Sequence, residues 1–195
     1  GDQHEPYTEK DLTDSPGWYG QTKMMAERAI QESDCKYTIL RLNYPFGRTG
    51  NYKLDWINKL IEKLEKGEIL TLFNDQWINP IWIDDINRAT GFVIENGPHN
   101  QIYHLGPDEY ETPLSLTTKL VDIFKFNISL IKSNSLMNLT IENREMRIFY
   151  PQNCRLENEK FKTTSRFHFT EVSDGLKKLL ESERFKYVRS NLFIV

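Results

Sequence analysis

Strand-like and helix-like segments alternate along this chain, and this alternation constrains the fold more than any other feature of the sequence. Short runs of apolar and β-branched residues predict strands, and they lie at residues 37–42, 69–73, 80–83, 102–105 and 128–131. Between these runs, apolar residues recur every three or four positions, which predicts helices with one buried face. The predicted class is therefore α/β, with helices flanking a parallel sheet.

Proline and glycine mark where the predicted helices begin and end. Pro16 opens a helix expected over residues 17–32, and Thr112-Pro113 opens another. Gly67 and Gly97-Pro98 are placed to end two more helices. A last helix is expected over residues 171–181. These boundaries divide the chain into units whose order can be compared with a fold.

Composition excludes several classes of partner. The 195 residues are 38% hydrophobic and 12% aromatic, which suits a packed core. The net charge of -3 gives no basic excess for nucleic acid, and no apolar run approaches the roughly 20 residues of a membrane span. Cys35 and Cys154 show no metal-ligand spacing, and residues 1–10 do not resemble a signal peptide. We expect a cytoplasmic protein that binds neither nucleic acid nor membrane.

The sharpest local motif is Tyr19-Gly20-Gln21-Thr22-Lys23. Residues four apart share one face of a helix, so Tyr19 and Lys23 are predicted to lie side by side. An ammonium group beside a phenol favours the phenolate. Such a pair could exchange a proton with an alcohol or ketone oxygen near neutral pH. Taken alone, the spacing favours a chance pair on a solvated helix face, because a Tyr and a Lys often occur at this separation.

The residues around this motif resemble a known family. Pro6-Tyr7-Thr8-Glu9, Asp14-Ser15-Pro16 and Ala26-Glu27 flank the motif. Together they are similar to the active-site segment of extended short-chain dehydrogenases, in particular the dTDP-4-dehydrorhamnose reductase branch. Further segments resemble that family in the same order along the chain, at residues 39–47, 74–76, 80, 82–85, 103–106 and 154–161.

This resemblance implies a fold and a division into domains. The chain would be the carboxy-terminal part of an NAD(P)-binding Rossmann-type fold, a parallel sheet with flanking helices, joined to a small mixed α/β substrate-binding lobe. Residues 1–52 would be a remnant of the Rossmann domain, with the Tyr/Lys helix and the following strand. Residues 53–195 would be mainly the substrate-binding lobe, with segments at about 69–105 returning to the main sheet.

The resemblance also implies roles for single residues. Tyr19 would donate the proton to a keto oxygen, and Lys23 would hold the nicotinamide ribose and tune Tyr19. The cofactor would be NADP or NAD, and the substrate a nucleotide-linked 6-deoxy sugar. The nicotinamide or the sugar would be walled by Asn43, Tyr44, Pro45 and Phe46. Weaker candidates for substrate contacts are Gln76, Trp77 and Arg155, of which the arginine suits a diphosphate.

Two features of the family are absent from the sequence. The close glycine pairs, Gly17 with Gly20 and Gly47 with Gly50, do not make the G-x-G-x-x-G turn that holds a dinucleotide pyrophosphate. A Ser or Thr that contacts the substrate carbonyl would precede a turn whose glycine resembles Gly1. We therefore expect that the nucleotide-binding segment lies outside this chain, that residues 37–42 form a strand with an unpaired edge, and that the isolated chain binds NAD(P) poorly.

Other readings of the same residues stay open. The chain could be a non-catalytic regulatory protein, similar to the regulatory subunit of methionine adenosyltransferase, an inactive fragment, or part of a sugar-nucleotide epimerase or dehydratase. The family suggests a homodimer through the Tyr/Lys helix. Asp84 and Asp85 could form a carboxylate pair, but a helix cap is the simpler interpretation. His104 is predicted to be a packed or hydrogen-bonded residue of a strand, and no metal site is expected.

Overall fold

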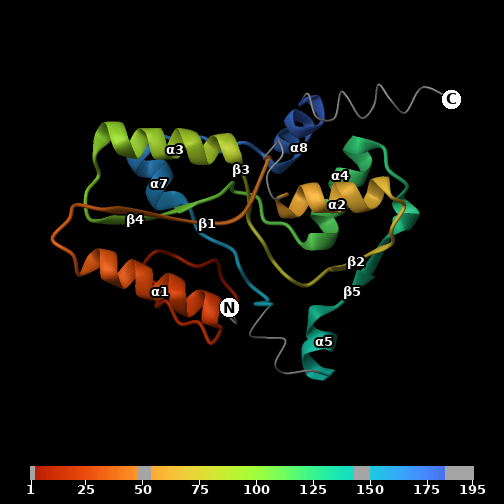
Figure 1. Ribbon diagram of the computed structural model, residues 1–195, viewed down its shortest axis with the longest axis horizontal. Coiled ribbons are helices and arrows are strands. Elements are labelled where there is room, and N and C mark those ends of the chain that lie inside the picture. The colour runs from red at the N-terminus through yellow and green to blue at the C-terminus, as the bar shows by residue number, and fades with distance from the viewer. Residues whose placement is uncertain (1–2, 48–53, 143–149, 183–195) are drawn as a thin grey trace.

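The computed structural model describes residues 3–47, 54–142 and 150–182 (Figure 1). Helices and strands alternate through these residues, and two separate parallel sheets organise them. The larger sheet has helices on both faces, and the smaller sheet lies beside a group of three helices. The predicted α/β class is confirmed.

The larger sheet is built around the longest strand, β1 (Thr38–Phe46). Its first half pairs in parallel with β4 (Gln101–Leu105), so that Arg41 stands opposite His104. Its second half pairs in parallel with β3 (Pro80–Trp82). Parallel strands require a crossover, which α3 (Ile83–Asn96) supplies between β3 and β4.

The two faces of this sheet differ in character. Alternate residues of the strands point to one face, where α3 and α7 (Glu159–Ser165) lie. There Tyr103, Leu105 and Phe161 are buried, with Leu40 and Leu42 packed against them. The opposite face carries Arg41 and is covered by α1 (Trp18–Gln31). The apolar face is therefore the core face, whereas the face toward α1 is mixed, because Arg41 and His104 lie on it together with Ile39 and Ile102.

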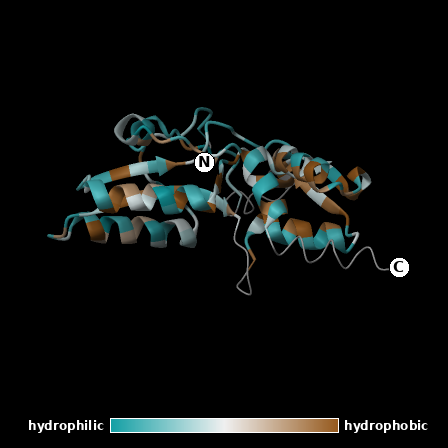
Figure 2. Cartoon of the chain, turned by 90° about the horizontal axis from the view of Figure 1, so that it is seen from above, coloured by the Kyte–Doolittle hydropathy of each residue, from teal (hydrophilic) through white to brown (hydrophobic). Residues whose placement is uncertain are grey.

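The smaller sheet pairs β2 (Leu70–Phe73) in parallel with β5 (Ile131–Asn134). Three amphipathic helices surround it, α2 (Trp56–Glu65), α4 (Pro113–Phe124) and α8 (Val172–Glu181). Their apolar residues meet in one core, and Figure 2 shows hydrophobic and hydrophilic segments alternating along the helices. The core that results includes Ile57, Ile61, Leu116, Leu120, Leu176 and Leu179, together with Phe46 and Trp82 from the larger sheet. This shared core joins the two halves of the chain.

Side chains define where several of these elements begin. Thr112 accepts a hydrogen bond from the Ser115 backbone N–H, and the Ser115 hydroxyl accepts one from the Thr112 N–H, forming a capping box at the start of α4. Asp55 caps α2 through the Asn58 N–H. The predicted helix start at Thr112-Pro113 is confirmed. A 3-10 turn, η1 (Ile128–Leu130), and α5 (Leu136–Glu142) complete the described elements.

Two expectations drawn from the sequence were wrong. Residues 128–131 were expected to be a strand, but the Asn127 side chain accepts from the Ser129 N–H, which starts the 3-10 turn, and β5 begins only at Ile131. Neither Asp84 nor Asp85 caps α3, whose N-cap is Trp82. Asp85 instead accepts hydrogen bonds from the backbone N–H and hydroxyl of Thr170.

The expected division of the chain can be compared with the strand pairing. Within the segment at about 69–105, β3 and β4 pair with β1, whereas β2 pairs with β5 in the smaller sheet. The boundary predicted at residue 52 lies outside the described residues, as do Gly1 and Gly50.

Candidate functional site

Tyr19 and Lys23 lie side by side in the first turns of α1. The Lys23 Nζ is 5.4 Å from the centre of the Tyr19 ring, as expected for residues four apart on a helix. Tyr19 is 77% exposed, and no side chain of α1 is buried. The side of the helix with Thr22, Ala26, Ala29 and Ile30 is exposed as well. The pair is therefore presented at a surface.

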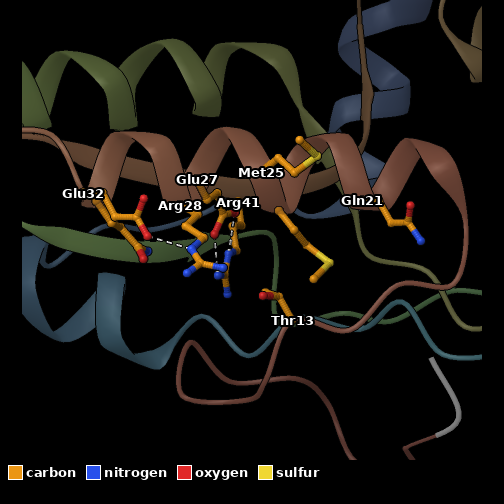
Figure 3. Close-up of a pocket in the computed structure, with 9 residues that line it drawn as sticks. Thr13, Gln21, Met25, Glu27, Arg28, Glu32 and Arg41 are labelled. Carbon is orange, nitrogen blue, oxygen red and sulfur yellow. Dashed lines mark hydrogen bonds and ion pairs between the residues drawn. The ribbon is translucent and has the colours of Figure 1, made fainter.

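α1 turns a narrow face, made of Gly20, Met24 and Glu27, toward the rest of the molecule. Gly20 lies so close to Ser15 that a Cβ there would be 2.0 Å from the Ser15 Oγ. Glu27 forms an ion pair with Arg41 on β1 (Figure 3). A groove of about 640 Å³ runs along this side of the helix, lined by Gln21, Met24, Met25 and Arg41 among others.

Lys23 lines a different cavity, of about 750 Å³, between α1 and two loop segments. Its other walls include Tyr7, Arg41, His104 and Asn153. His104 is almost fully buried, as the sequence predicted. This cavity therefore connects the Lys23 side chain with the segment around residue 153, which precedes the candidate Arg155.

Asn43 uses both ends of its side-chain amide to hold other segments. Its Oδ1 accepts a hydrogen bond from the Asn79 backbone N–H at 3.0 Å, and its Nδ2 donates to the Cys154 carbonyl oxygen. The Asn79 amide in turn donates to the carbonyl oxygens of Pro107 and Glu109. Asn43 thus ties the carboxyl end of β1 to segments that carry candidate substrate residues.

Tyr44 lies at an irregularity in the β1–β3 pairing and has a positive φ of 46°. A bulky residue in this region is strained, the more so before a proline. The distortion turns the Tyr44 ring onto Trp56, with ring centres 5.4 Å apart. Burial raises the pKa of the Tyr44 phenol, with smaller contributions from Cys154 and Tyr150, so this hydroxyl stays protonated.

The next two residues have opposite environments. Pro45 is exposed, whereas Phe46 is buried in the core against Trp82, with ring centres 5.5 Å apart. Gly175 allows this packing, because a Cβ there would lie 2.7 Å from the Phe46 ring. Of the four residues expected to wall a ligand, Phe46 is thus the one whose ring is enclosed by protein.

The candidate substrate residues come together around Arg155. Its guanidinium lies 5.4 Å from the Trp77 ring and 5.5 Å from the Tyr110 ring. Nε donates to the Asn153 Oδ1, and Nη2 donates to the His4 carbonyl oxygen. Gln76, the residue before Trp77, is buried, and its side-chain amide donates to the Pro151 carbonyl oxygen at 3.0 Å.

Sequence reasoning missed Tyr110 and Asn153. Asn153 is buried, and its amide donates to the carbonyl oxygens of Gln3 and Glu5, which fixes the segment that carries Arg155. Neither residue belongs to a local motif, so only the tertiary structure brings them to the site. Between residues 3 and 182, leaving out the two gaps, no hydrogen bond or ion pair links Tyr19 or Lys23 to Gln76, Trp77 or Arg155.

Two further observations concern metal ions and membrane spans in the described part. It contains no cluster of three or more side chains suited to bind a metal ion. Nor does any helix in residues 3–47, 54–142 and 150–182 have the length and apolar character needed to cross a membrane.

The fold defines the class. The structure superposes on the NADP complex of a Bacillus anthracis dTDP-4-dehydrorhamnose reductase with a TM-score of 0.78 and 18% identity, over 93% of this chain and 60% of that one. It superposes on a Thermotoga maritima UDP-glucose 4-epimerase with a TM-score of 0.71 and 22% identity, over 98% and 60%. The parallel sheet and its helices are therefore those of the Rossmann-type reductases and epimerases.

The sequence places the chain within this class. Residues 1–185 match the profile described as RmlD substrate binding domain, and the chain belongs to this family. It is 26% identical over 187 residues to a Shigella flexneri dTDP-4-dehydrorhamnose reductase, covering 92% of this chain and 60% of the relative. It is also 26% identical over 157 residues to a Danio rerio methionine adenosyltransferase 2 subunit beta, covering 78% and 47%. The resemblance inferred from the motifs is confirmed, and the chain spans at most about 60% of these relatives.

Proposed function

We propose that this chain carries the proton-transfer pair and part of the sugar-nucleotide site of an NAD(P)-dependent keto reductase. The single observation that supports the assignment most is the placement of Lys23. It lies beside Tyr19 on α1 and lines the cavity that extends to the segment of Arg155. The similarity to dTDP-4-dehydrorhamnose reductases over most of the chain supports the same reaction class. The substrate proposed is a 4-keto-6-deoxy sugar linked to a nucleotide.

In this proposal Tyr19 and Lys23 have different roles in the reaction. The Tyr19 hydroxyl donates a proton to the keto oxygen while bound NADPH or NADH supplies the hydride. The Lys23 ammonium holds the ribose hydroxyls and favours the charge that develops on Tyr19. The exposure of both side chains leaves room for a substrate and a cofactor above the helix. Tyr44 and Pro45 lie at the end of β1 and would line the sugar.

The substrate end of the proposed site is the cluster around Arg155. Two of its nitrogens are engaged by His4 and Asn153, which fixes the plane of the guanidinium. An arginine held in this way is suited to bind a diphosphate oxygen. Trp77 is 40% exposed and offers a ring face to a base or a sugar. Gln76 would support the loop rather than contact the substrate directly, because its amide already bonds to Pro151.

A nucleotide-binding half is the partner that we propose for the exposed side of α1. Among the described residues, β4 is the only strand that pairs with residues 38–42 of β1, so one edge of that strand is available. Trp18 is 75% exposed and Met25 is 64% exposed on the adjoining helix. Strand pairing along β1 and packing over α1 would cover both features and bring a pyrophosphate-binding turn to Lys23.

The test is a reductase assay on the protein expressed from its own gene, with a dTDP-4-keto-6-deoxy sugar and NADPH. Tyr19→Phe removes only the hydroxyl and is expected to lower kcat by about 100-fold or more. Tyr37→Phe makes the same change at a half-buried tyrosine next to β1 and serves as the matched control. If Tyr19→Phe and Tyr37→Phe turn over the keto sugar equally fast, the proposed role of Tyr19 is wrong.

The similarity to a methionine adenosyltransferase subunit favours a second candidate, a regulatory protein of the same fold. In that case the chain would change the kinetics of a partner enzyme, and Tyr19→Phe would not alter the effect. Measuring methionine adenosyltransferase activity with and without the chain separates the two. An effect on that enzyme without keto-sugar reduction would favour the regulatory function.

A further inference from the structure

An ion pair joins α1 to the larger sheet. The Glu27 carboxylate accepts two hydrogen bonds from Arg41, at 2.9 Å from Nε and 2.6 Å from Nη2 (Figure 3). Over residues 3–47, 54–142 and 150–182, no other hydrogen bond or ion pair connects a residue of α1 with a strand of either sheet. The two side chains are 18% and 21% exposed. α1 has no buried side chain, so this pair is the polar contact that links the helix to the sheet.

Arg41 is itself oriented by His104, its neighbour on β4. Arg41 Nη1 lies 3.4 Å from His104 Nε2, and His104 Nδ1 lies 3.0 Å from the Tyr7 carbonyl oxygen. A carbonyl oxygen can only accept, so Nδ1 carries the hydrogen of the neutral ring. Nε2 is then left with a lone pair that accepts from Arg41. The tautomer of His104 is thus assigned by its hydrogen-bond partners.

We propose that Arg41 is a positioning residue for the Tyr19–Lys23 pair, held by the lone pair of His104 and reaching Glu27 one helical turn after Lys23. The planar fork of an arginine can bond to a carboxylate with two nitrogens and to a third group with another. A lysine has a single donor nitrogen, so it cannot reproduce the two-nitrogen contact with the carboxylate while another nitrogen reaches His104. The catalytic consequence rests on the proposed function, whereas the placement of α1 by Arg41 does not depend on it.

The charges around His104 make this arrangement sensitive to pH. Burial lowers the pKa of His104, the charge of Arg41 acts in the same direction, and Glu9 opposes both. Hydrogen bonds to the backbone of Tyr7 and Glu157 also raise the pKa of His104. Asp11 interacts with the ring through its charge, and Glu27 lies beyond Arg41. Protonation would direct an Nε2–H at the Arg41 guanidinium and remove its acceptor.

The sign of the effect follows from linkage. The unfolded or undocked histidine takes up its proton near pH ~6.5, whereas the buried ring does so only at a lower pH. The contribution of His104 is therefore complete above about pH 6.5 and is lost as the pH falls through the lowered pKa. α1 should be held less firmly once the pH falls below the lowered pKa of His104.

The first test measures hydrogen exchange of the 195-residue chain, comparing peptides from α1 with peptides from α4. Glu27→Gln is expected to speed exchange of α1 by roughly tenfold or more, since a hydrogen-bonded charge is lost, with α4 unchanged. Glu32→Gln is the matched control. Glu32 is the C-cap of α1, and its ion pair with Arg28 is local to the helix. Both side chains of this pair are exposed, so the pair contributes little to stability. Equal exchange of α1 in the two variants would overturn the proposal.

Arg41→Lys keeps the charge and tests the geometry. If geometry matters, Arg41→Lys speeds exchange of α1 about as much as Glu27→Gln does. Wild-type exchange in Arg41→Lys would show that any cation suffices and would contradict the positioning role. Should an Arg41 variant unfold the larger sheet, exchange of peptides from β4 reports it, and Glu27→Gln on the helix surface still decides.

The second test separates the two ring nitrogens of His104. His104→Gln keeps an acceptor near the position of Nε2, and His104→Asn keeps only a donor near that of Nδ1. After correction for intrinsic rates, exchange of α1 in the wild type, followed from about pH 7.5 downward, should accelerate as the pH falls through the lowered pKa of His104. His104→Gln should be slow over the whole range and His104→Asn fast over the whole range. If Gln and Asn behave alike, the lone pair of His104 has no such role.

The catalytic consequence is measured in the reductase assay. Glu27→Gln is expected to lower kcat by about tenfold with little change in the KM for the sugar nucleotide, because the proposed diphosphate contact is made by Arg155 and not by α1. If Tyr19→Phe leaves turnover intact, the proposed function fails and the exchange results stand. If Tyr19→Phe abolishes turnover and Glu27→Gln does not change kcat, the positioning role in catalysis fails.

Discussion

α1 and α4 are helices of similar length held in place by different forces. α4 buries six of its twelve residues and begins with a complete capping box. α1 buries none of its fourteen residues, and its N-cap Gly17 makes no side-chain cap. One is fixed by apolar packing in the lobe around the smaller sheet. The other lies on the face of the larger sheet that carries Arg41 and is linked to it by the ion pair between Glu27 and Arg41.

This difference separates the part of the molecule that stabilises it from the part proposed to react. Apolar burial contributes most of the stability of a domain, and it is concentrated around α2, α4 and α8. Segments with few buried contacts open more readily. Tyr19 and Lys23 therefore lie on a helix whose placement a few polar groups can change, whereas the lobe around the smaller sheet is held by apolar packing.

The largest expected change in the free energy of unfolding comes from removing a buried side chain in the lobe around the smaller sheet. Leu116 is fully buried in α4, so Leu116→Ala should lower the free energy of unfolding by about 2–5 kcal/mol through lost burial and a cavity. Ile30→Ala on α1, at a side chain that is 42% exposed, should cost less than about 1 kcal/mol. Urea titration followed by circular dichroism measures both. Equal losses would show that α1 is packed as firmly as α4.

A smaller effect is expected from removing the cap of α4. Thr112→Ala leaves the Ser115 N–H without its acceptor and should cost about 1 kcal/mol. Thr118→Ala, at an exposed position of the same helix, is the control, and it should change the free energy of unfolding by less than about 0.5 kcal/mol. A cost for Thr112→Ala no larger than that of the control would mean that packing alone holds α4.

A local, pH-dependent effect is expected at Asp75. Burial raises its pKa, but hydrogen bonds from the Ser135 hydroxyl and the backbone N–H groups of Leu136 and Met137 outweigh this and lower the pKa overall. The unfolded state therefore takes up the proton first, near pH ~4. The contribution of Asp75 is present above that value and is lost as the pH falls through the lowered pKa.

The check on Asp75 is hydrogen exchange of α5 as a function of pH. In the wild type, exchange corrected for intrinsic rates should accelerate below about pH 4. Asp75→Asn should exchange faster throughout, by about tenfold or less, with little dependence on pH. A pH dependence that persists in Asp75→Asn would assign the effect to another carboxylate.

The smallest effect is expected from the cofactor. Because the chain has no G-x-G-x-x-G turn, NADPH added to the 195-residue chain should shift its Tm by less than about 1 °C. Isothermal titration calorimetry provides the direct measurement. Micromolar binding of NADPH would contradict this expectation and would show that the exposed side of α1 holds a nucleotide by itself.

Much of the local structure could be predicted from the sequence. Apolar periodicity located α2, α4 and α8, and short apolar runs located β1, β2 and β4, since both patterns reflect backbone geometry and burial of one face. The spacing of Tyr19 and Lys23 predicted their contact for the same reason. The motif order also predicted the family. The prediction that Asp84 or Asp85 caps α3 was wrong, because Asp85 accepts a hydrogen bond from the distant Thr170 instead.

Only the tertiary structure decided which distant segments meet. Asn43 bonds to the Cys154 carbonyl oxygen, 111 residues away. Trp77 and Tyr110 enclose Arg155 from two separate loops, and β2 pairs with β5 rather than with β1. A local pattern fixes the conformation of a segment, but its partner is selected by the packing of the whole chain. The sequence therefore determined the Tyr–Lys pair itself, and the fold determined that Arg41 and His104 hold its helix.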